Sequence, residues 1–249
     1  MELLTLIEHA KLNFDENGTP ISSAFDDIYF SKHDGIAETE YVFIKHNQLQ
    51  DRWPVISDQF HIGETGFGTG LNFLVAWQLL NQVNQTRNTP LKLKFTSFEK
   101  YPVTQQDLKQ ALSAWPQLKE LADALIQSYP VAFTDEHVIT LQDGLVELNL
   151  IIGDVNQRIK ELPSLSGNDG IHAWFLDGFA PSKNPDMWTD NLYKNMARLS
   201  APGATLATFT AAGAVRRGLQ AVGFEVKKVK GFGHKREMLS AQLTNETIG

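Results

Sequence analysis

Apolar and polar positions follow two alternating periods along the chain from about residue 58 onward. Short apolar or alternating runs of strand length are separated by longer segments in which apolar residues recur at helical spacing. The expected strands are residues 59–63, 91–98, 137–142, 146–152, 171–176, 204–209, 224–229 and 236–243. The expected helices are residues 71–83, 104–129 in two parts, 185–199 and 211–222.

Turn and capping residues set several of these boundaries. Asp143-Gly144 is a favoured tight-turn pair and predicts a hairpin between the two strands that flank it. Pro116 breaks the long helical segment into two helices. Asn184 is the expected N-cap of the next helix, with a proline at the first helical position, and Gly223 is expected to end the last helix.

Strands that alternate with helices predict an α/β fold with a doubly wound, mostly parallel, Rossmann-like sheet covered on both faces. The last two strands are joined by too short a connection for a crossover helix, so the last strand is expected to be antiparallel. The helices after the second strand form an insert at about 103–130. Weak alternation at 28–30 and 41–44 predicts a small N-terminal β element (1–57) packed on a core domain (58–249).

The composition is that of a globular domain, since 42% of the 249 residues are hydrophobic and 20% are charged. The absence of cysteine excludes a disulfide scaffold, a thiolate zinc site and cysteine nucleophilic catalysis, and no metal is expected. No apolar run approaches the roughly 18–20 residues of a membrane span. The N-terminus also lacks the features of a signal peptide, so a cytoplasmic protein without a membrane partner is expected.

The net charge of −7 conceals a strong asymmetry. Residues 1–190 carry 13 basic and 26 acidic side chains, whereas residues 191–236 carry 9 basic side chains and one acidic side chain. Such a basic segment predicts a face that binds a polyanion, although a solvated surface is the alternative. The side chains expected to contact phosphates are Arg216, Arg217, Lys227, Lys228, Lys230, Lys235 and Arg236.

The strongest local motif is the segment 64–70, Glu-Thr-Gly-Phe-Gly-Thr-Gly, between the first expected strand and its helix. Glycines at this place let the backbone turn tightly and approach a ligand. A nicotinamide-dependent oxidoreductase would have a small residue at the third glycine position, where this chain has Leu71. The Gly-x-Gly-x-Gly spacing after an acidic residue instead resembles class I S-adenosylmethionine-dependent methyltransferases. A purely structural turn remains open.

Carboxylates follow the ends of the next strands. Glu99 is placed to accept hydrogen bonds from both hydroxyls of a ribose. Asp154 follows the strand at 146–152 and resembles the acidic residue near the adenine amino group in these methyltransferases, so it is favoured over Asp143, which is more simply a turn residue. Asp177 follows the strand at 171–176, which lies beside the strand at 59–63 in a doubly wound sheet, so it should share a crevice with the glycine turn.

Asp177 could orient the N–H groups of an acceptor amine and also receive the released proton. Orientation is the better-supported role, because an alkylamine with a pKa near ~10.4 is mostly charged at neutral pH and a carboxylate favours that charge. The alternative is that Asp177-Gly178 only turns the chain. Phe67 and Phe179 could border a cofactor or stack on a base, or belong to the core, and Tyr29 could cover the site from the N-terminal element.

Several motifs together resemble one family. They are the segments 26–30, 64–74, 97–100, 174–188, 207–219 and 231–239. They are similar to the methyltransferase domain of the bifunctional tRNA 5-methylaminomethyl-2-thiouridine biosynthesis proteins, the MnmC family, over about residues 10–243. The resemblance implies that the domain at 58–249 transfers a methyl group from S-adenosyl-L-methionine to the amine of 5-aminomethyl-2-thiouridine at the tRNA wobble position. The product would be 5-methylaminomethyl-2-thiouridine.

The expected site follows from these motifs and this resemblance. The expected catalytic residue is Asp177. The expected cofactor-binding residues are Glu64, Gly66, Phe67, Gly68, Thr69, Gly70, Asn72, Glu99, Lys100, Asp154, Asp177 and Gly178. The expected substrate-binding residues are Tyr29, Phe179, Arg216, Arg217, Lys235 and Arg236.

The family also implies a partner. In its members an FAD-dependent oxidoreductase domain follows and removes a carboxymethyl group first. This sequence holds no second glycine-rich dinucleotide motif, so the oxidative step is not expected of it. A non-catalytic RNA-binding module on the same fold is the remaining alternative.

Overall fold

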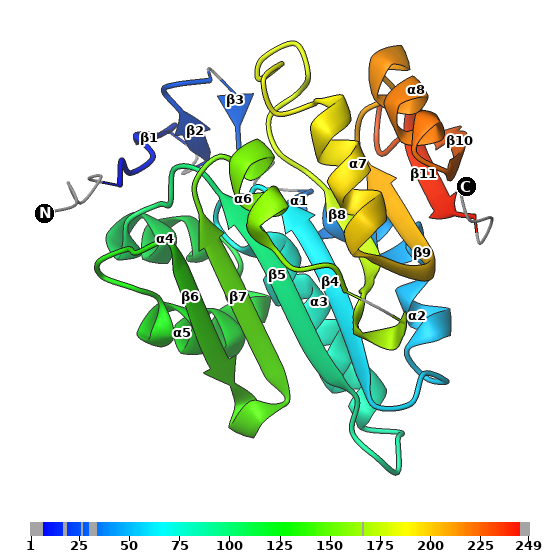
Figure 1. Cartoon of the computed structure of the whole chain (residues 1–249). Coiled ribbons are helices and arrows are strands. Elements are labelled where there is room, and N and C mark those ends of the chain that lie inside the picture. Colours follow the sequence, from blue (N-terminus) through cyan, green and yellow to red (C-terminus); the bar gives the residue numbers. More distant parts are fainter. Residues whose placement is uncertain (1–6, 17–18, 26, 30–33, 166, 245–249) are drawn as a thin grey trace, which may run out of the picture.

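An eight-stranded sheet forms the centre of the computed structural model, which describes residues 7–16, 19–25, 27–29, 34–165 and 167–244 (Figure 1). Its strands are β4 (Gln59–Thr65), β5 (Lys92–Glu99), β6 (Glu136–Leu141), β7 (Val146–Ile152), β8 (Ile171–Leu176), β9 (Ser200–Thr208), β10 (Phe224–Lys230) and β11 (Glu237–Leu243). Their order across the sheet is β10-β11-β9-β8-β4-β5-β7-β6. The order reverses between β4 and β8, the point at which open α/β sheets bind ligands.

The sheet is parallel at its centre and antiparallel at both edges. β9, β8, β4, β5 and β7 are parallel, which confirms the predicted doubly wound arrangement. β6 forms the predicted hairpin with β7. The predicted antiparallel last strand is also confirmed. β11 turns back after β10 and inserts between β10 and β9, antiparallel to both.

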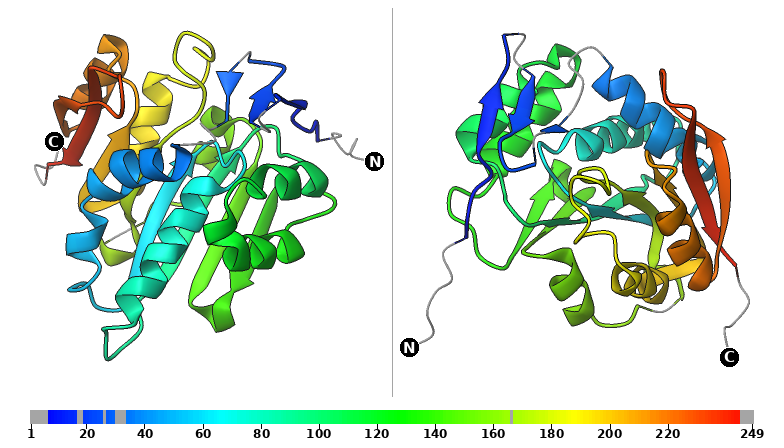
Figure 2. Two further views of the ribbon diagram at one scale, coloured as in Figure 1. Left: turned by 180° about the vertical axis from the view of Figure 1, so that it is seen from behind. Right: turned by 90° about the horizontal axis from the view of Figure 1, so that it is seen from above.

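Helices cover both faces of the sheet, as Figures 1 and 2 show. One face carries α1 (Gly35–Thr39), the π-helix η1 (Glu40–Lys45), α2 (Leu49–Arg52), α3 (Leu71–Asn84), α4 (Gln105–Leu112) and α5 (Lys119–Ser128). The other face carries α6 (Val155–Glu161), α7 (Asp190–Leu199) and α8 (Gly213–Ala221). Short 3-10 turns complete the elements: η2 (Pro116–Leu118), η3 (Gln142–Gly144) and η4 (Gly167–Asp169).

Two apolar clusters hold these layers together, one on each face of the sheet. All six residues of β8 are buried, because helices cover both sides of this central strand. Phe175 of β8 stacks on Phe43 in one cluster, and Trp174 belongs to the other. The insert at about 103–130 forms α4 and α5, and the break at Pro116 is confirmed as η2.

A small antiparallel sheet lies over the carboxyl ends of the parallel strands (Figure 1). It consists of β1 (Leu12–Phe14), β2 (Pro20–Ser22) and β3 (Asp27–Ile28). This confirms a β element near the N-terminus, although Phe30 of the expected strand at 28–30 lies outside the described residues. The domain boundary at residue 57 stays a prediction.

The expected strand at 41–44 was wrong, because this segment is helical within η1. Val42, Phe43 and Ile44 are consecutive and all buried against the sheet and α3. Periodicity alone cannot separate such a short apolar run in a buried helix from one in a strand. The packing of Phe43 on the central sheet decides in favour of the helix.

The expected start of the helix at 185–199 was also wrong. The helix begins at Asp190, and its N-cap is Thr189, whose hydroxyl oxygen accepts the N–H of Leu192 at 3.1 Å, not Asn184. The side-chain amide of Asn156 donates to the backbone carbonyls of Asp186 and Met187. These tertiary hydrogen bonds occupy carbonyls that an earlier helix start would need.

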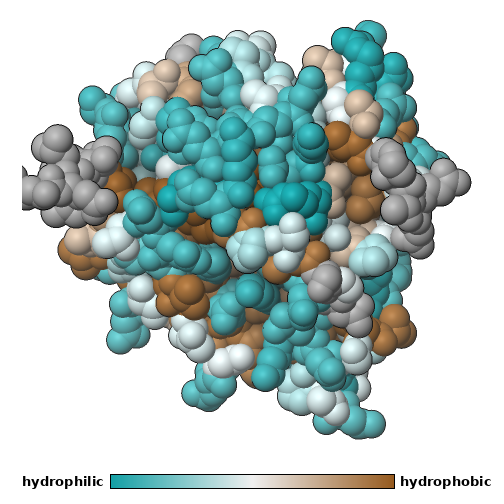
Figure 3. Space-filling view, viewed as in Figure 1, coloured by the Kyte–Doolittle hydropathy of each residue, from teal (hydrophilic) through white to brown (hydrophobic). Residues whose placement is uncertain are grey.

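Hydrophilic side chains dominate the face that Figure 3 shows, with apolar side chains visible mostly between them. Among the described residues, no helix combines the length and the apolar character that crossing a bilayer requires.

Candidate active site

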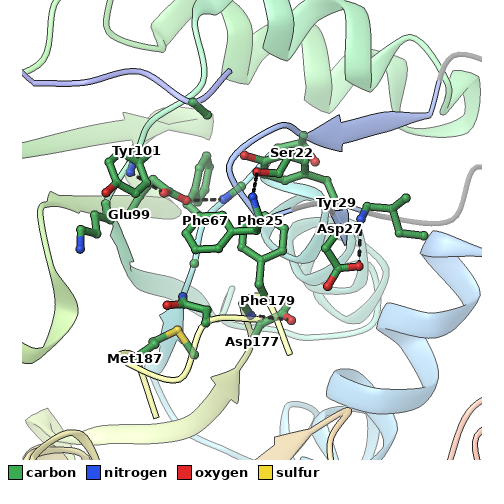
Figure 4. A pocket seen from close by; sticks show the side chains of 18 of the residues that line it. Ser22, Phe25, Asp27, Tyr29, Phe67, Glu99, Tyr101, Asp177, Phe179 and Met187 are labelled. Atoms are coloured by element: carbon green, nitrogen blue, oxygen red, sulfur yellow. Dashed lines mark hydrogen bonds between the residues drawn. The ribbon is translucent and has the colours of Figure 1, made fainter. Parts of the chain in front are cut away.

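A cavity of about 890 Å³ opens at the carboxyl ends of the central strands. The β4–α3 turn, the ends of β5, β7 and β8, the β1–β3 sheet and α1 all contribute to its wall. Figure 4 shows Glu99 and Tyr101 on one side, Ser22, Tyr29 and Asp27 on another, and Asp177 beside the loop after β8. This volume is within the range of about 300–1,000 Å³ for small-molecule and cofactor sites.

The glycine turn has a backbone that only glycine adopts readily. Gly66, Gly68 and Gly70 have φ values of 80°, 54° and 72°. A Cβ at Gly66 would lie 3.3 Å from the Cα of Gly178, so the turn also packs closely on the end of β8. The turn therefore presents the segment Gly66–Thr69 to the cavity, whereas Gly70 is the N-cap of α3 and does not line it.

Glu99 supports this turn from the end of β5. Its carboxylate accepts the N–H of Gly68 at 2.8 Å through Oε2 and the N–H of Tyr101 at 2.9 Å through Oε1. Burial raises the pKa of Glu99, while these backbone N–H groups act in the opposite direction. Each carboxylate oxygen keeps a further lone pair, so the side chain can still accept from two hydroxyl groups in the cavity.

Glu64 lies beneath the cavity rather than in its wall. It is fully buried and accepts the Ser97 hydroxyl at 2.6 Å and the side-chain amide of Asn72 at 3.0 Å. Burial holds the pKa of Glu64 well above its usual value. Glu64 therefore reaches the cavity through Asn72, which does line it.

Asp177 faces the cavity directly after β8. Its Oδ2 accepts the side-chain amide of Asn72 at 2.7 Å, and its Oδ1 accepts the N–H of Gly178 at 2.8 Å. Burial raises the pKa of Asp177 to about 6, against the effect of those two hydrogen bonds. The Thr65 hydroxyl donates to the Asp177 carbonyl at 2.6 Å. The predicted crevice shared by Asp177 and the glycine turn is confirmed, because β8 is the neighbour of β4.

Lys100 and Asp154 form an ion pair of 3.0 Å in the wall on the β5 and β7 side. Asp154 also caps α6 through the N–H of Asn156 at 2.9 Å. The pKa of Lys100 is raised by its hydrogen bond to Asp154. Both predicted residues thus line the cavity and contact each other; their contact with a cofactor stays a prediction.

Aromatic rings cover the opening from the N-terminal sheet. Phe25 stacks on Phe179 at 4.5 Å between ring centroids, and Tyr29 meets Phe179 edge-on at 5.4 Å. A Cβ at Gly68 would lie 3.1 Å from the ring of Tyr29, so this ring rests on the glycine turn. Phe67 is a buried core residue, only 3% exposed, that also lines the cavity.

Lys235 is the expected substrate-binding cation that lines the cavity. Its Nζ lies 2.8 Å from Oε1 of Glu38 and 5.1 Å from the ring centroid of Phe209. Arg216 and Arg217 lie on α8, outside the cavity wall, and Arg236, which is exposed, precedes β11. Their phosphate contacts stay predictions.

Ion pairs reduce the charge of the basic segment. Lys227 lies 3.1 Å from Glu225, and Lys228 lies 2.6 Å from Glu237. Both lysines belong to β10, the edge strand of the sheet. Charged side chains on an edge strand also discourage pairing with another sheet, so these lysines have a structural reason to be present.

Sequence reasoning assigned no role to several residues of the wall, among them Phe25, Glu38 and Thr39. Thr39 donates its hydroxyl to Oδ1 of Asn72 at 2.8 Å and so connects α1 to the Asp177 network. No local signal marks these residues, because each reaches the cavity through the packing of a distant segment. Among the described residues, no group of three or more histidine, aspartate or glutamate side chains could hold a metal ion.

The fold and the site define a class of protein. A positive-φ glycine turn after the first parallel strand, a carboxylate at the tip of the second and a cofactor-sized cavity at the switch point are features of a Rossmann-like nucleotide-cofactor enzyme. The spacing of the turn is that of class I methyltransferases. A family model described as S-adenosyl-L-methionine-dependent methyltransferase matches residues 116–244, and the chain belongs to this family. Its cofactor is therefore S-adenosyl-L-methionine, which decides against the nicotinamide alternative.

Two curated relatives are similar to almost the whole of this chain. The chain is 52% identical over 244 residues to the tRNA 5-methylaminomethyl-2-thiouridine biosynthesis bifunctional protein MnmC of Aliivibrio fischeri, covering 97% of this chain and 36% of that protein. It is 51% identical over 240 residues to the protein of the same name from Ectopseudomonas mendocina, covering 96% of this chain and 35% of that protein. The chain thus spans about a third of the length of these curated relatives.

Two solved structures share the fold. The crystal structure of MNMC2 from Aquifex aeolicus matches with a TM-score of 0.73 and 23% identity, covering 96% of this chain and 71% of that one. Spermidine synthase from Thermotoga maritima matches with a TM-score of 0.53 and 9% identity, covering 95% and 72%. At these identities the likeness concerns the fold alone, and it agrees with the predicted Rossmann-like class.

Proposed function

We propose that this chain methylates the primary amine of a 5-aminomethyl-2-thiouridine at the wobble position of tRNA, with S-adenosyl-L-methionine as methyl donor. The observation that carries the proposal is the Asp177 carboxylate, held by Asn72 and Gly178 in a cofactor-sized cavity beside the glycine turn. It is supported by relatives of about 50% identity whose name refers to 5-methylaminomethyl-2-thiouridine biosynthesis.

The cofactor fits the residues present. The turn at Gly66–Thr69 offers a closely approachable backbone, and Glu99 keeps two lone pairs for ribose hydroxyls. Asp154, paired with Lys100, lies on the side of the cavity where β7 ends and is proposed to contact the adenine. When bound, S-adenosyl-L-methionine supplies an activated methyl group on a sulfonium, so the chain must mainly bring the amine into line with it.

Asp177 is proposed to hold the acceptor amine. Each of its oxygens accepts one hydrogen bond from the protein and keeps a lone pair for an amine N–H. An alkylammonium has a pKa of about 10.4 and no lone pair, so it must lose a proton before it can attack the methyl group. Asp177, with a pKa of about 6, is a weak base toward it, so this proton passes to solvent. Orientation of the N–H groups is therefore its main role. Phe179 and Tyr29 are proposed to border the uridine.

The pH dependence of kcat/KM should report Asp177. Its pKa is raised to about 6, so the carboxylate is protonated below that pH and ionised above it. Because only the ionised form offers acceptors on both oxygens, the slope of log(kcat/KM) against pH should decrease by about one near pH 6, where the Asp177 limb ends. The amine titrates far above this limb. Steady-state rates between about pH 5 and 8 test this; a midpoint near the ordinary aspartate value would contradict it.

Arg216 and Arg217 are proposed to contact tRNA phosphates. Reversal of both charges to Glu should weaken tRNA binding and lower the slope of log Kd against log salt by roughly 2, since each phosphate contact releases about one counterion. The matched control reverses Lys92 and Lys160, which are exposed lysines outside the basic segment. Filter binding over a salt series measures both effects. Equal slopes in the two double variants would place the RNA elsewhere.

The proposed reaction is tested by transfer of a labelled methyl group from S-adenosyl-L-methionine to tRNA that carries the aminomethyl precursor. Unmodified tRNA of the same sequence is the control. We expect label only in the precursor tRNA, and nucleoside digestion should place it on the side-chain nitrogen. Equal labelling of both tRNAs, or of neither, would refute the proposed acceptor.

An FAD-dependent oxidoreductase is the proposed partner of this methyltransferase, either joined to it or separate. The proposal is supported by the relatives, which are described as bifunctional and are about three times as long as the matched region. Cytoplasmic location agrees with a tRNA substrate and stays a prediction.

A further inference from the structure

The wall of the cavity carries far more negative than positive charge. Among the described residues that line it, seven are aspartates or glutamates and three are lysines. Each of those lysines has a carboxylate within 4 Å: Lys11 has Glu8, Lys100 has Asp154, and Lys235 has Glu38. The described wall therefore offers attraction to a cation, and it holds no lysine without a carboxylate beside it.

Glu38 and Lys235 stand on the acceptor side of this cavity. Glu38 precedes Thr39, whose hydroxyl binds Asn72, and Asn72 in turn binds Asp177. This chain of hydrogen bonds fixes the end of α1 relative to β8. Glu38 is 28% exposed and Lys235 is 50% exposed, so their 2.8 Å ion pair lies at the opening rather than in the core.

The charges of this pair act on Asp177. The carboxylate of Glu38 raises the pKa of Asp177, and the ammonium of Lys235 lowers it, in addition to the larger effect of burial. Both groups are therefore close enough to influence a charge held beside Asp177. An acceptor amine bound there would lie in the field of two carboxylates and one lysine already paired with one of them.

We propose that Glu38 is a specificity-determining residue that selects an acceptor with a free cationic amine and rejects one whose amine carries an anionic substituent. The inference rests on the proposed function and adds the residues that discriminate between acceptors. Glu38 acts in two ways. It adds negative charge that attracts an ammonium, and it occupies Lys235, the cation that an anionic substituent would need.

The physical reason is the cost of an unpaired charge. A carboxylate moved from water into the partly buried wall loses hydration, and it gains no compensating partner while Lys235 remains bound to Glu38. It would also face Asp177 and Glu38 at close range. Discrimination by such a repulsive element is a common way of rejecting a near-identical ligand.

The experiment compares two tRNAs that differ only at the wobble nucleoside, one with the aminomethyl group and one with its N-carboxymethyl derivative. The measured quantity is the ratio of their dissociation constants, together with kcat/KM for the aminomethyl tRNA. The ratio cancels any general effect of a lost charge on tRNA affinity. The variants are Glu38→Gln, Lys235→Gln, the double variant and the control Glu40→Gln, an exposed carboxylate outside the wall.

Glu38→Gln should shift the ratio about tenfold toward the carboxymethyl tRNA, which corresponds to about 1.4 kcal/mol. This gain in relative affinity for the carboxymethyl tRNA should require Lys235, so it should disappear in the double variant. Lys235→Gln alone should shift the ratio the other way, because Glu38 is then unpaired; this arm tests the proposal even if Glu38→Gln fails to fold. Glu40→Gln should leave both quantities unchanged.

The outcomes separate the inference from the proposed function. If the wild-type chain methylates neither tRNA, the proposed function fails. If it methylates the aminomethyl tRNA but Glu38→Gln behaves as Glu40→Gln, the specificity role of Glu38 is overturned. A gain that persists in the double variant would equally overturn the role assigned to Lys235.

Discussion

Replacement of Asp177 by Ala is expected to lower the rate of methyl transfer by at least about 10²-fold, the scale of losses that follow misplacement of a reacting group. The variant removes both acceptor oxygens that Asn72 and Gly178 hold toward the cavity. Cofactor binding should fall less than the rate, because the turn and Glu99 are intact, and tRNA binding should change little, because the basic surface is intact. Single-turnover transfer of a labelled methyl group measures the rate, and equilibrium titration measures the two affinities.

A control variant and a stability measurement make this result specific. Asp58→Ala removes an exposed carboxylate at the opposite end of β4 and should retain full activity. The free energy of unfolding of Asp177→Ala at neutral pH should not decrease because of the lost negative charge. Because the folded-state pKa of Asp177 is raised to about 6, its contribution to stability is present at low pH and is lost as the pH rises through that value. An unchanged rate of transfer would exclude Asp177 from catalysis, and it would leave the acceptor side to other groups.

Replacement of Glu99 by Ala should weaken S-adenosyl-L-methionine binding on the order of 10²-fold. A hydrogen bond to a charged group is worth about 1.5–3 kcal/mol, and the variant removes the carboxylate proposed to accept from two ribose hydroxyls. It also leaves the N–H groups of Gly68 and Tyr101 without their acceptor, which loosens the turn. Isothermal titration of the cofactor into the purified protein measures the effect.

The matched control for Glu99 is Glu147→Ala. Glu147 lies on the neighbouring strand β7, where it forms a half-exposed ion pair with Lys94 at 3.6 Å and does not line the cavity. Exposed pairs of this kind contribute little, so its cofactor affinity should stay within about threefold of wild type. If Glu99→Ala binds the cofactor as tightly as Glu147→Ala, the ribose assignment is wrong.

The positions of several site residues could be predicted from the ends of the strands. Parallel strands of one sheet finish at the same edge, so residues directly after consecutive strands meet even when they are far apart in sequence. Glu99 and Asp177 could therefore be placed beside the glycine turn from the pattern of strands and helices alone. The need for positive φ at Gly66 and Gly68 was likewise readable from a Gly-x-Gly spacing at a strand end.

Contacts that depend on packing could not be placed in this way. The run at 41–44 has the same local pattern in a buried helix and in a strand, and only the stacking of Phe43 on Phe175 favours the helix. The helix at Asp190 starts late because Asn156 binds the preceding carbonyls. In both cases the deciding partner is at least 30 residues away in sequence.

The basic segment also shows which properties the sequence determines and which depend on tertiary structure. Sequence by itself determined that positive charge is concentrated between residues 191 and 236, and that a methyltransferase-type glycine turn precedes this segment within a Rossmann-like sheet. Tertiary structure alone decided how that charge is used. Lys227 and Lys228 pair with carboxylates on the edge hairpin, whereas Lys235 pairs at the cavity opening with Glu38, 197 residues away. Local patterns encode element type and order through backbone and burial preferences, but an ion pair between distant segments exists only once the sheet has brought their ends together.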